Sequence, residues 1–242
     1  MSLAELGYAV RHPRVALSYL RMSDRIAELT GASTEEVRRY SNEPALSGIT
    51  ERVFENYRGY HRSVLGPAKK PRRAIAYYVI CRILKPDKIV ETGVQSGLSS
   101  SFLLQAMKEN SKGSLYSVDL PDEKLLEAIP SEARLGRKSG WVVPEELGKN
   151  WKLLTGKSSD KLPALLDDLK TVDIFIHDSD HSFENMYWEF NTAWPYLAKN
   201  GMLLSDDIEL NNAFDKFASE IKGSPVRLTH TIGGIRKIHS LE

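Results

Sequence analysis

The sequence predicts an α/β protein with a doubly wound, mostly parallel seven-stranded sheet and a helical N-terminal extension. Three observations lead to this prediction. From residue 72 onward, short β-branched segments alternate with segments of helical spacing, several strand segments end in an acid, and a two-glycine loop follows the first of them. Strands that alternate with helices form βαβ units, whose parallel strands are covered on both faces.

Residues 1–70 are predicted to form the helical extension, and residues 71–242 the sheet domain. Ser33 followed by Glu36 is a capping-box pattern, which predicts that a helix starts there. Apolar side chains then recur near helical spacing at Val53, Phe54, Tyr57, Tyr60 and Val64. The basic segment Lys69-Lys70-Pro71-Arg72-Arg73 is interpreted as a solvated linker before the next helix.

The sheet domain is expected to contain five parallel strands followed by two closing strands. Helices are predicted at 72–84, 99–109, 161–169, 183–197 and 212–221. Strands are predicted at 88–91, 114–119, 151–154, 172–177 and 202–205, with a long irregular insert over 120–150. Two short strands at 226–229 and 235–238, with a turn at Gly233-Gly234, are expected to add an antiparallel edge.

The composition indicates an ordinary globular protein. Hydrophobic residues make up 41% and charged residues 27%, and the formal net charge is +1, so neither disorder nor a general attraction to nucleic acid or membranes is expected. The single cysteine, Cys81, lies in an apolar run and is predicted to be buried. No apolar run approaches the roughly 20 residues that span a bilayer, and no signal segment is evident, so a cytoplasmic location is expected.

The segment from Glu91 to Ser99 is the most informative part of the chain. A short strand ends at Glu91, a loop with Gly93 and Gly97 follows, and a helix starts near Ser99. Glycines allow tight turns and close approach of a ligand, and a helix N-terminus has free N–H groups, so a small polar cofactor is predicted here. The alternative is an ordinary strand–turn–helix connection. The spacing departs from G-x-G-x-x-G, which argues against a nicotinamide cofactor.

Acids follow four of the predicted strands, at Glu91, Asp119, Asp178 and Asp206-Asp207. In open α/β sheets, ligands bind at the carboxyl ends of the strands. Like charges gathered there repel, so a cation or hydrogen-bond donors should compensate them. Asp119 comes about one βα unit after the glycine loop, which suggests that it accepts from ribose hydroxyls. The alternative for Asp119 is a cap or turn acid.

A second predicted cluster lies at the fourth and fifth strands and consists of Asp178, Asp180, His181, Asp206 and Asp207. Hard oxygen ligands suit Mg²⁺ or another divalent cation such as Ca²⁺. Asp180 or His181 would face the same cleft and could take a proton from a substrate hydroxyl. The alternative is that Asp180 or Ser182 caps the following helix and that the Asp206-Asp207 pair forms a turn.

Together these segments resemble the class I S-adenosylmethionine-dependent methyltransferases over roughly residues 72–240. The glycine loop looks like the E-x-G-x-x-x-G-x-S form of the metal-dependent, catechol-type O-methyltransferases. Residues 172–182 are similar to the V-D-x-x-x-x-D-x-D-H-S stretch of methyltransferase family 24, and residues 201–207 match the fifth-strand pattern of the same group.

The resemblance implies S-adenosylmethionine as the cofactor and assigns a role to each matching residue. The methionine end would be held by Glu91, Gly93, Ser96, Gly97 and Ser99, and Thr92 and Asp178 are further cofactor-binding residues. Asp119 would bind the ribose, and Gly156 and Ser158 would approach the adenine. The metal-ligand positions of the catechol-type branch are occupied by Asp178, Asp206 and Asp207. His181 stands where that branch has a lysine base, so the general base would be Asp180 or His181.

The expected function is O-methylation of a hydroxyl on a small molecule or sugar, with or without a divalent cation. One alternative is a regulatory protein that binds S-adenosylmethionine, and another is a different reaction on the same scaffold, as in hydroxylase-like relatives. The expected partner is a small-molecule or glycan acceptor, with no nucleic acid or membrane partner. The N-terminal helices could support a homo-oligomer.

Overall fold

The computed structural model describes residues 20–57, 71–120 and 138–238. Its seven strands form one sheet in the order β3-β2-β1-β4-β5-β7-β6. The strands are β1 (Lys88–Thr92), β2 (Ser114–Asp119), β3 (Trp151–Thr155), β4 (Val172–His177), β5 (Leu197–Ser205), β6 (Pro225–Arg227) and β7 (Gly233–Arg236). The strands β1 to β5 pair in parallel, and β7 runs antiparallel between β5 and β6. This is the predicted doubly wound sheet.

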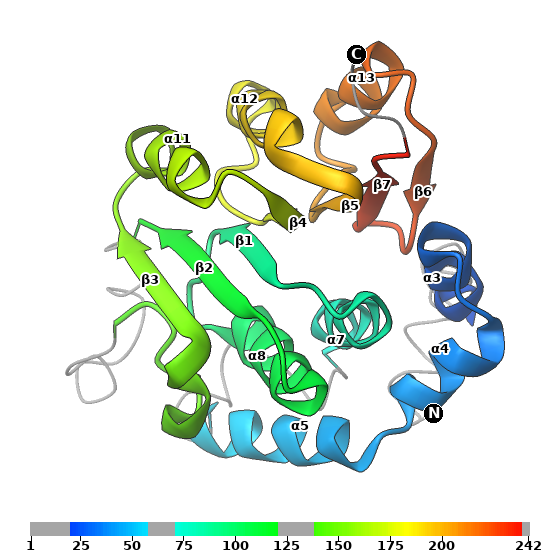
Figure 1. Ribbon diagram of the computed structural model, residues 1–242, viewed down its shortest axis with the longest axis vertical. Coiled ribbons are helices and arrows are strands. Elements are labelled where there is room, and N and C mark those ends of the chain that lie inside the picture. The colour runs from blue at the N-terminus through cyan, green and yellow to red at the C-terminus, as the bar shows by residue number, and fades with distance from the viewer. Residues whose placement is uncertain (1–19, 58–70, 121–137, 239–242) are drawn as a thin grey trace.

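Helices cover both faces of the sheet (Figure 1). On one face lie α7 (Arg72–Leu84) and α8 (Leu98–Asn110), with α3 (Met22–Thr30) beside α7 against β6 and β7, and α4 (Thr34–Ser41) and α5 (Pro44–Tyr57) packed on the outside of α7 and α8. The other face is covered by α11 (Ser158–Leu169), α12 (Phe183–Ala193) and α13 (Ala213–Glu220). Two short 3₁₀ helices, η1 (Glu145–Asn150) and η2 (Trp194–Tyr196), precede β3 and β5.

The central strands are apolar on both sides because each face packs against helices. Along β4, Ile174 and Ile176 join the core under α7 and α8, while Phe175 between them joins the core under α12 and α13. This alternation follows from the two-residue period of a strand. Two hydrophobic cores therefore fix the sheet from opposite sides. Cys81 is buried in the first of them, as predicted.

The N-terminal helices share the core of the sheet domain. The predicted cap of α4 is present, since the Ser33 side chain accepts from the Glu36 N–H at 3.1 Å. Arg82 of α7 makes two 2.8 Å hydrogen bonds to Glu43, which also accepts from the Tyr78 hydroxyl. The predicted domain boundary near residue 70 lies outside the described residues and stays a prediction.

Two predictions about elements are corrected. Gly233 and Gly234 do not form the turn between the closing strands but lie inside β7, where a Cβ at Gly233 would be 2.6 Å from the Phe214 ring and one at Gly234 2.5 Å from Leu29. They allow close packing rather than a turn, and residues 228–232 connect the strands. The helix expected over 183–197 ends at Ala193, because η2 follows and β5 starts at Leu197.

Within the described ranges, no helix is both long and apolar enough to cross a membrane.

Candidate functional site

The glycine loop lies where three segments of backbone meet. Gly93 has φ 82°, and a Cβ there would lie 2.0 Å from the Asp178 carbonyl oxygen at the end of β4. Gly97 has φ 87° and is the N-cap of α8, and a Cβ there would lie 2.7 Å from the Gly140 Cα. Both positions therefore require glycine for conformation and for space. The loop is held close to the end of β4, as the cofactor prediction requires.

Asp119, at the end of β2, organises this loop. One carboxylate oxygen accepts from the Val94 N–H at 2.9 Å and the Gln95 N–H at 3.4 Å. The other oxygen accepts from the Ser139 hydroxyl. Asp119 is thus a buried acid with donors on both oxygens, and the ribose contact stays a prediction.

The segment that starts at Ser139 lies along the glycine loop. The Gly140 N–H donates to the Gln95 carbonyl at 2.8 Å, and the Val142 N–H donates to the Ser96 carbonyl at 3.0 Å. These backbone bonds hold Ser96, which is 7% exposed, under the segment. The C-terminal part of the irregular insert is therefore ordered and packs along the glycine loop.

Glu91 and Thr92 point their side chains into the protein beneath the loop. Glu91 is 1% exposed, and one of its oxygens accepts from the Ser100 hydroxyl at 2.5 Å and the Ser117 hydroxyl at 2.6 Å. Burial raises the pKa of Glu91 to about 7. The Thr92 hydroxyl donates to Glu189 at 2.5 Å. The contact of Glu91 with the methionine end of the cofactor and the role of Thr92 in cofactor binding stay predictions.

Ser99, in the first turn of α8, has a different environment. Its hydroxyl is buried and has no hydrogen-bond partner in the part of the chain that the structure describes. An unpaired buried hydroxyl beside the free N–H groups of a helix start fits a bound polar ligand.

The end of β3 brings the predicted adenine-side residues next to β2. The Gly156 N–H donates to the Asp119 carbonyl at 2.9 Å. Ser158 starts α11, and its hydroxyl lies 3.5 Å from the side-chain oxygen of Asn185. Gly156 therefore lies beside the ribose-side acid, and Ser158 faces α12.

The acids after β4 and β5 surround an arginine that the sequence analysis did not assign to the site. Arg73 Nη1 lies 3.1 Å from Asp178 Oδ1, and the same nitrogen donates to Asp206 Oδ2. The interpretation of the basic segment as a solvated linker is wrong for Arg73, which lies in the first turn of α7 and has two carboxylate partners. In the sequence, the only indication of such a residue is that the acids after the strands need a cation to compensate their charge.

His181 lies with the acids. Its Nε2 is 3.4 Å from Asp207 and 3.8 Å from Asp178, and it has no hydrogen-bond partner among the described residues. The Asp178 carboxylate raises the pKa of His181, partial burial opposes this, and the charge of Asp207 adds to the increase. Nε2 of the imidazole therefore faces two carboxylates.

Asp180 has a local role in this structure. It is exposed, and its carboxylate accepts from the Ser182 N–H at 2.9 Å. The Ser182 hydroxyl in turn accepts from the Asn185 N–H at 3.3 Å, so Ser182 is the N-cap of α12, as the capping alternative predicted. Of the two candidate bases, His181 is the one that lies among the acids.

The predicted metal ligands do not form a metal cage. Across the described ranges, no three or more His, Cys, Asp or Glu side chains are grouped so that they could hold a metal ion. The arrangement of Asp178, Asp206 and Asp207 therefore does not fit the expected divalent cation, and the Arg73 guanidinium lies against two of them.

A buried network that the sequence analysis missed supports the end of β4. The Glu189 carboxylate contacts His177 Nδ1 at 2.7 Å and accepts from the Ser179 hydroxyl at 2.7 Å. Burial alone would raise the pKa of Glu189, but His177 and the hydroxyls of Ser158 and Thr92 together outweigh it, and the pKa is lowered. His177 and Ser179, two of the partners of Glu189, flank Asp178, so the network positions that acid. Glu189 is an isolated acid in a helical segment, and no sequence pattern marks it.

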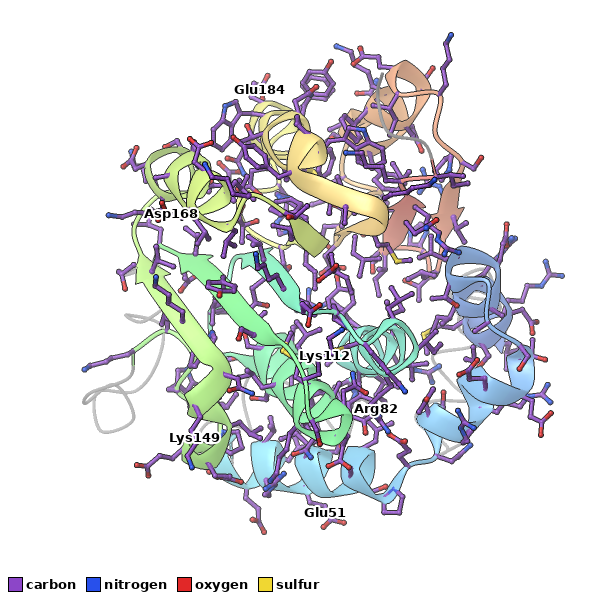
Figure 2. The ribbon with its side chains drawn as sticks, in the orientation of Figure 1. Glu51, Arg82, Lys112, Lys149, Asp168 and Glu184 are labelled. Atoms are coloured by element: carbon purple, nitrogen blue, oxygen red, sulfur yellow. The ribbon has the colours of Figure 1, made fainter. Side chains whose placement is uncertain are left out.

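Several acids at the strand ends are buried. Many charged side chains lie on the outside, as Glu51, Asp168 and Glu184 do in Figure 2, although Glu189 and Lys237 are buried away from the strand-end acids. At the strand ends, Asp206 is 4% and Asp119 7% exposed. Buried carboxylates at a row of strand ends indicate a binding site.

Comparison with known proteins agrees with this geometry. Residues 90–208 match the model of a family described as a methyltransferase domain. The matched part runs from β1 to just past Asp207 and so contains the glycine loop and the acids. No curated protein matches the chain significantly in sequence.

Solved structures with the same fold include several methyltransferases. The Podospora anserina methyltransferase PaMTH1, bound to SAH (S-adenosylhomocysteine), has a TM-score of 0.55 at 16% identity, covering 81% of this chain and 88% of that chain. The Bacillus cereus O-methyltransferase, also with SAH, has a TM-score of 0.53 at 13% identity, covering 81% and 92%. TomG from Streptomyces achromogenes, an O-methyltransferase of tomaymycin synthesis in complex with SAM, has a TM-score of 0.50 at 14% identity, covering 81% and 90%.

The sheet therefore has the fold of methyltransferases solved with S-adenosylhomocysteine or S-adenosylmethionine. Residues 90–208, which contain the motif of residues 172–182 and that of residues 201–207, match a methyltransferase domain.

Proposed function

We propose that this enzyme transfers the methyl group of S-adenosylmethionine to a hydroxyl of a small molecule or sugar. The observation that carries the proposal is the position of His181, whose Nε2 lies 3.4 Å from Asp207 and 3.8 Å from Asp178 at the edge of the sheet that holds the glycine loop. A base at this place suits removal of a hydroxyl proton. Two of the structural neighbours, from Bacillus cereus and Streptomyces achromogenes, are named O-methyltransferases.

The crevice residues fit the cofactor. The unpaired Ser99 hydroxyl and the N–H groups at the start of α8 would hold its methionine end. Asp119 would accept from the ribose hydroxyls in place of Ser139, and Gly156 and Ser158 would line the adenine side. When bound, the cofactor supplies a methyl group that its sulfonium already activates.

The residues of the chain then orient the acceptor and move one proton. His181 Nε2 takes the proton of the acceptor hydroxyl, and Asp178 and Asp207 stabilise the imidazolium that forms. The wall over the glycine loop excludes water and aligns donor and acceptor, which accounts for much of the rate gain in a reaction with an activated donor. No step passes through a metal, since the acids do not fit one.

A small molecule or glycan is the proposed acceptor rather than nucleic acid, because the net charge is only +1. A cytoplasmic location and a homo-oligomer formed through α3 to α5 are proposed on the sequence grounds given above.

The decisive experiment is release of S-adenosylhomocysteine from the purified protein with radiolabelled S-adenosylmethionine and panels of phenols, polyols and sugars. Release that depends on an acceptor supports methyl transfer. Binding without release would favour the regulatory alternative, and product that lacks the labelled methyl would favour a different reaction. His181→Ala should lower turnover about a hundredfold with nearly unchanged cofactor affinity. Asp180→Asn tests the other base, and a larger loss there would overturn the role of His181.

A further inference from the structure

We propose that Arg73 is the built-in cation of this site, which holds Asp178 and Asp206 where a divalent metal would otherwise neutralise them. The inference rests on the proposed function, because it makes Arg73 a positioning residue for methyl transfer.

The contacts of Arg73 support this role. Its Nη1 lies 3.1 Å from Asp178 Oδ1 and also donates to Asp206 Oδ2. The two carboxylates are mostly buried, with side-chain exposures of 17% and 6%. Buried carboxylates at adjacent strand ends need a compensating charge, and the guanidinium of arginine is always charged and binds carboxylates in a fixed geometry.

The place of Arg73 in its own helix supports the same reading. The first turn of α7 contains Arg72 and Arg73 and no acid. A positive charge at a helix N-terminus opposes the helix macrodipole, so local helix stability does not explain an arginine there. The contact with acids more than a hundred positions later does explain it.

A guanidinium in this position excludes a divalent cation. Mg²⁺ requires carboxylate oxygens at about 2.0–2.1 Å in octahedral geometry. Arg73 already occupies the space between Asp178 and Asp206, and its charge would repel a second cation there. The absence of a metal-binding group within the described ranges agrees with this.

Arg73 reaches the proposed base through one shared oxygen. Oδ1 of Asp178 lies 3.1 Å from Arg73 Nη1 and 3.8 Å from His181 Nε2. By fixing Asp178, the arginine fixes the carboxylate that faces the imidazole. One turn further along α7, Tyr77 is fully buried, and its hydroxyl has no hydrogen-bond partner among the described residues. The start of α7 is therefore a wall of the site.

The test measures Mn²⁺ binding by electron paramagnetic resonance on the full chain without acceptor. Arg73→Met leaves the acids uncompensated and should bind one Mn²⁺ at least about tenfold more tightly than the wild type. Adding Asp206→Asn to that variant should remove the gain. Arg73→Lys keeps the charge and should not gain a site. Arg227→Met is the matched control, because it removes an arginine from an exposed pair with Asp215 and should leave Mn²⁺ binding unchanged.

Two results would overturn the proposal: one tight Mn²⁺ site in the wild type that Asp206→Asn removes, or no gain in a folded Arg73→Met variant. If Arg73→Met does not fold, wild-type turnover in excess chelator decides, with full activity supporting the proposal and loss restored by Mn²⁺ overturning it. Mn²⁺ binding needs no acceptor, so failure of the methyl-transfer proposal is seen separately, as absence of product with every acceptor.

Discussion

His177 Nδ1 lies 2.7 Å from Glu189 Oε2, and both side chains are fully buried. This pair does not belong to the cluster of Asp178, Asp206 and Asp207 but supports it from the protein interior. Through Ser179 and Thr92, the same carboxylate ties the loop after β4 to the end of β1. The geometry around Asp178 therefore depends on a buried carboxylate outside the acid cluster.

Glu189→Ala should lower the free energy of unfolding by about 3–5 kcal/mol, because it leaves His177 and two hydroxyls without their buried partner. Denaturant unfolding followed by circular dichroism measures this loss. Glu184→Gln, an exposed change on the same helix, is the control and should stay within about 0.5 kcal/mol of the wild type. Equal stabilities of the two variants would show that the network does not support the fold.

Glu91 should make the stability of the protein depend on pH. Its pKa is raised by burial from the usual 4.5 to about 7, so the native state binds this proton more tightly than the unfolded chain. Its contribution is fully present below about pH 4.5 and is lost as the pH rises through about 7, a change of up to ~3 kcal/mol. Chemical unfolding at pH 5 and pH 8 measures the difference.

Glu91→Gln is the matched variant for this prediction. Both serine hydroxyls donate to the same Glu91 oxygen, which an amide oxygen can replace. The variant should lose less stability than the wild type between pH 5 and pH 8. Parallel profiles would contradict the raised pKa. Weaker cofactor binding by the variant would instead support the predicted contact with the methionine end.

The pH profile of turnover should have an acid limb set by His181. Its pKa is raised mainly by Asp178, with Asp207 adding to the effect, so the neutral base forms only above the usual range of a histidine. Turnover should fall as the pH falls through that raised pKa. Asp207→Asn removes one of the two charges and should shift the acid limb to lower pH in kcat profiles. An unshifted limb would argue that another group is the base.

Gly97→Val should abolish cofactor binding and destabilise the glycine loop. The residue has φ 87°, and a Cβ would lie 2.7 Å from Gly140. Thermal stabilisation by S-adenosylhomocysteine measures the loss, and Asp119→Ala should remove most of the same shift. Gly48→Ala is the control, because a Cβ added at Gly48 in α5 would have no atom within 4 Å. This substitution should raise the free energy of unfolding by about 0.5–1 kcal/mol. Normal stabilisation in folded Gly97→Val would contradict the proposed site.

The order of strands and helices, the sheet class and the acids at the strand ends could be predicted from the sequence. These features depend on local rules: strand and helix periods, the Ser33 cap, and glycines between a strand and a helix. Cys81 was assigned to the core for the same reason, because its neighbours in sequence are apolar. Each of these features depends on residues that lie close together in the sequence, so a local pattern is enough to predict it.

The contacts that define the site could be decided only by the tertiary structure. Arg73 and Asp206 are 133 positions apart, and Thr92 and Glu189 are 97 apart, so no sequence period connects them. Gly233 and Gly234 look like a turn in the sequence. In the fold they instead allow close packing against Phe214 and Leu29, which the sequence pattern does not reveal. The sequence by itself determined which chemical groups end the strands. Packing of the helices on the sheet decided which cation faces those acids, because a side chain's partner depends on the folded position of distant segments.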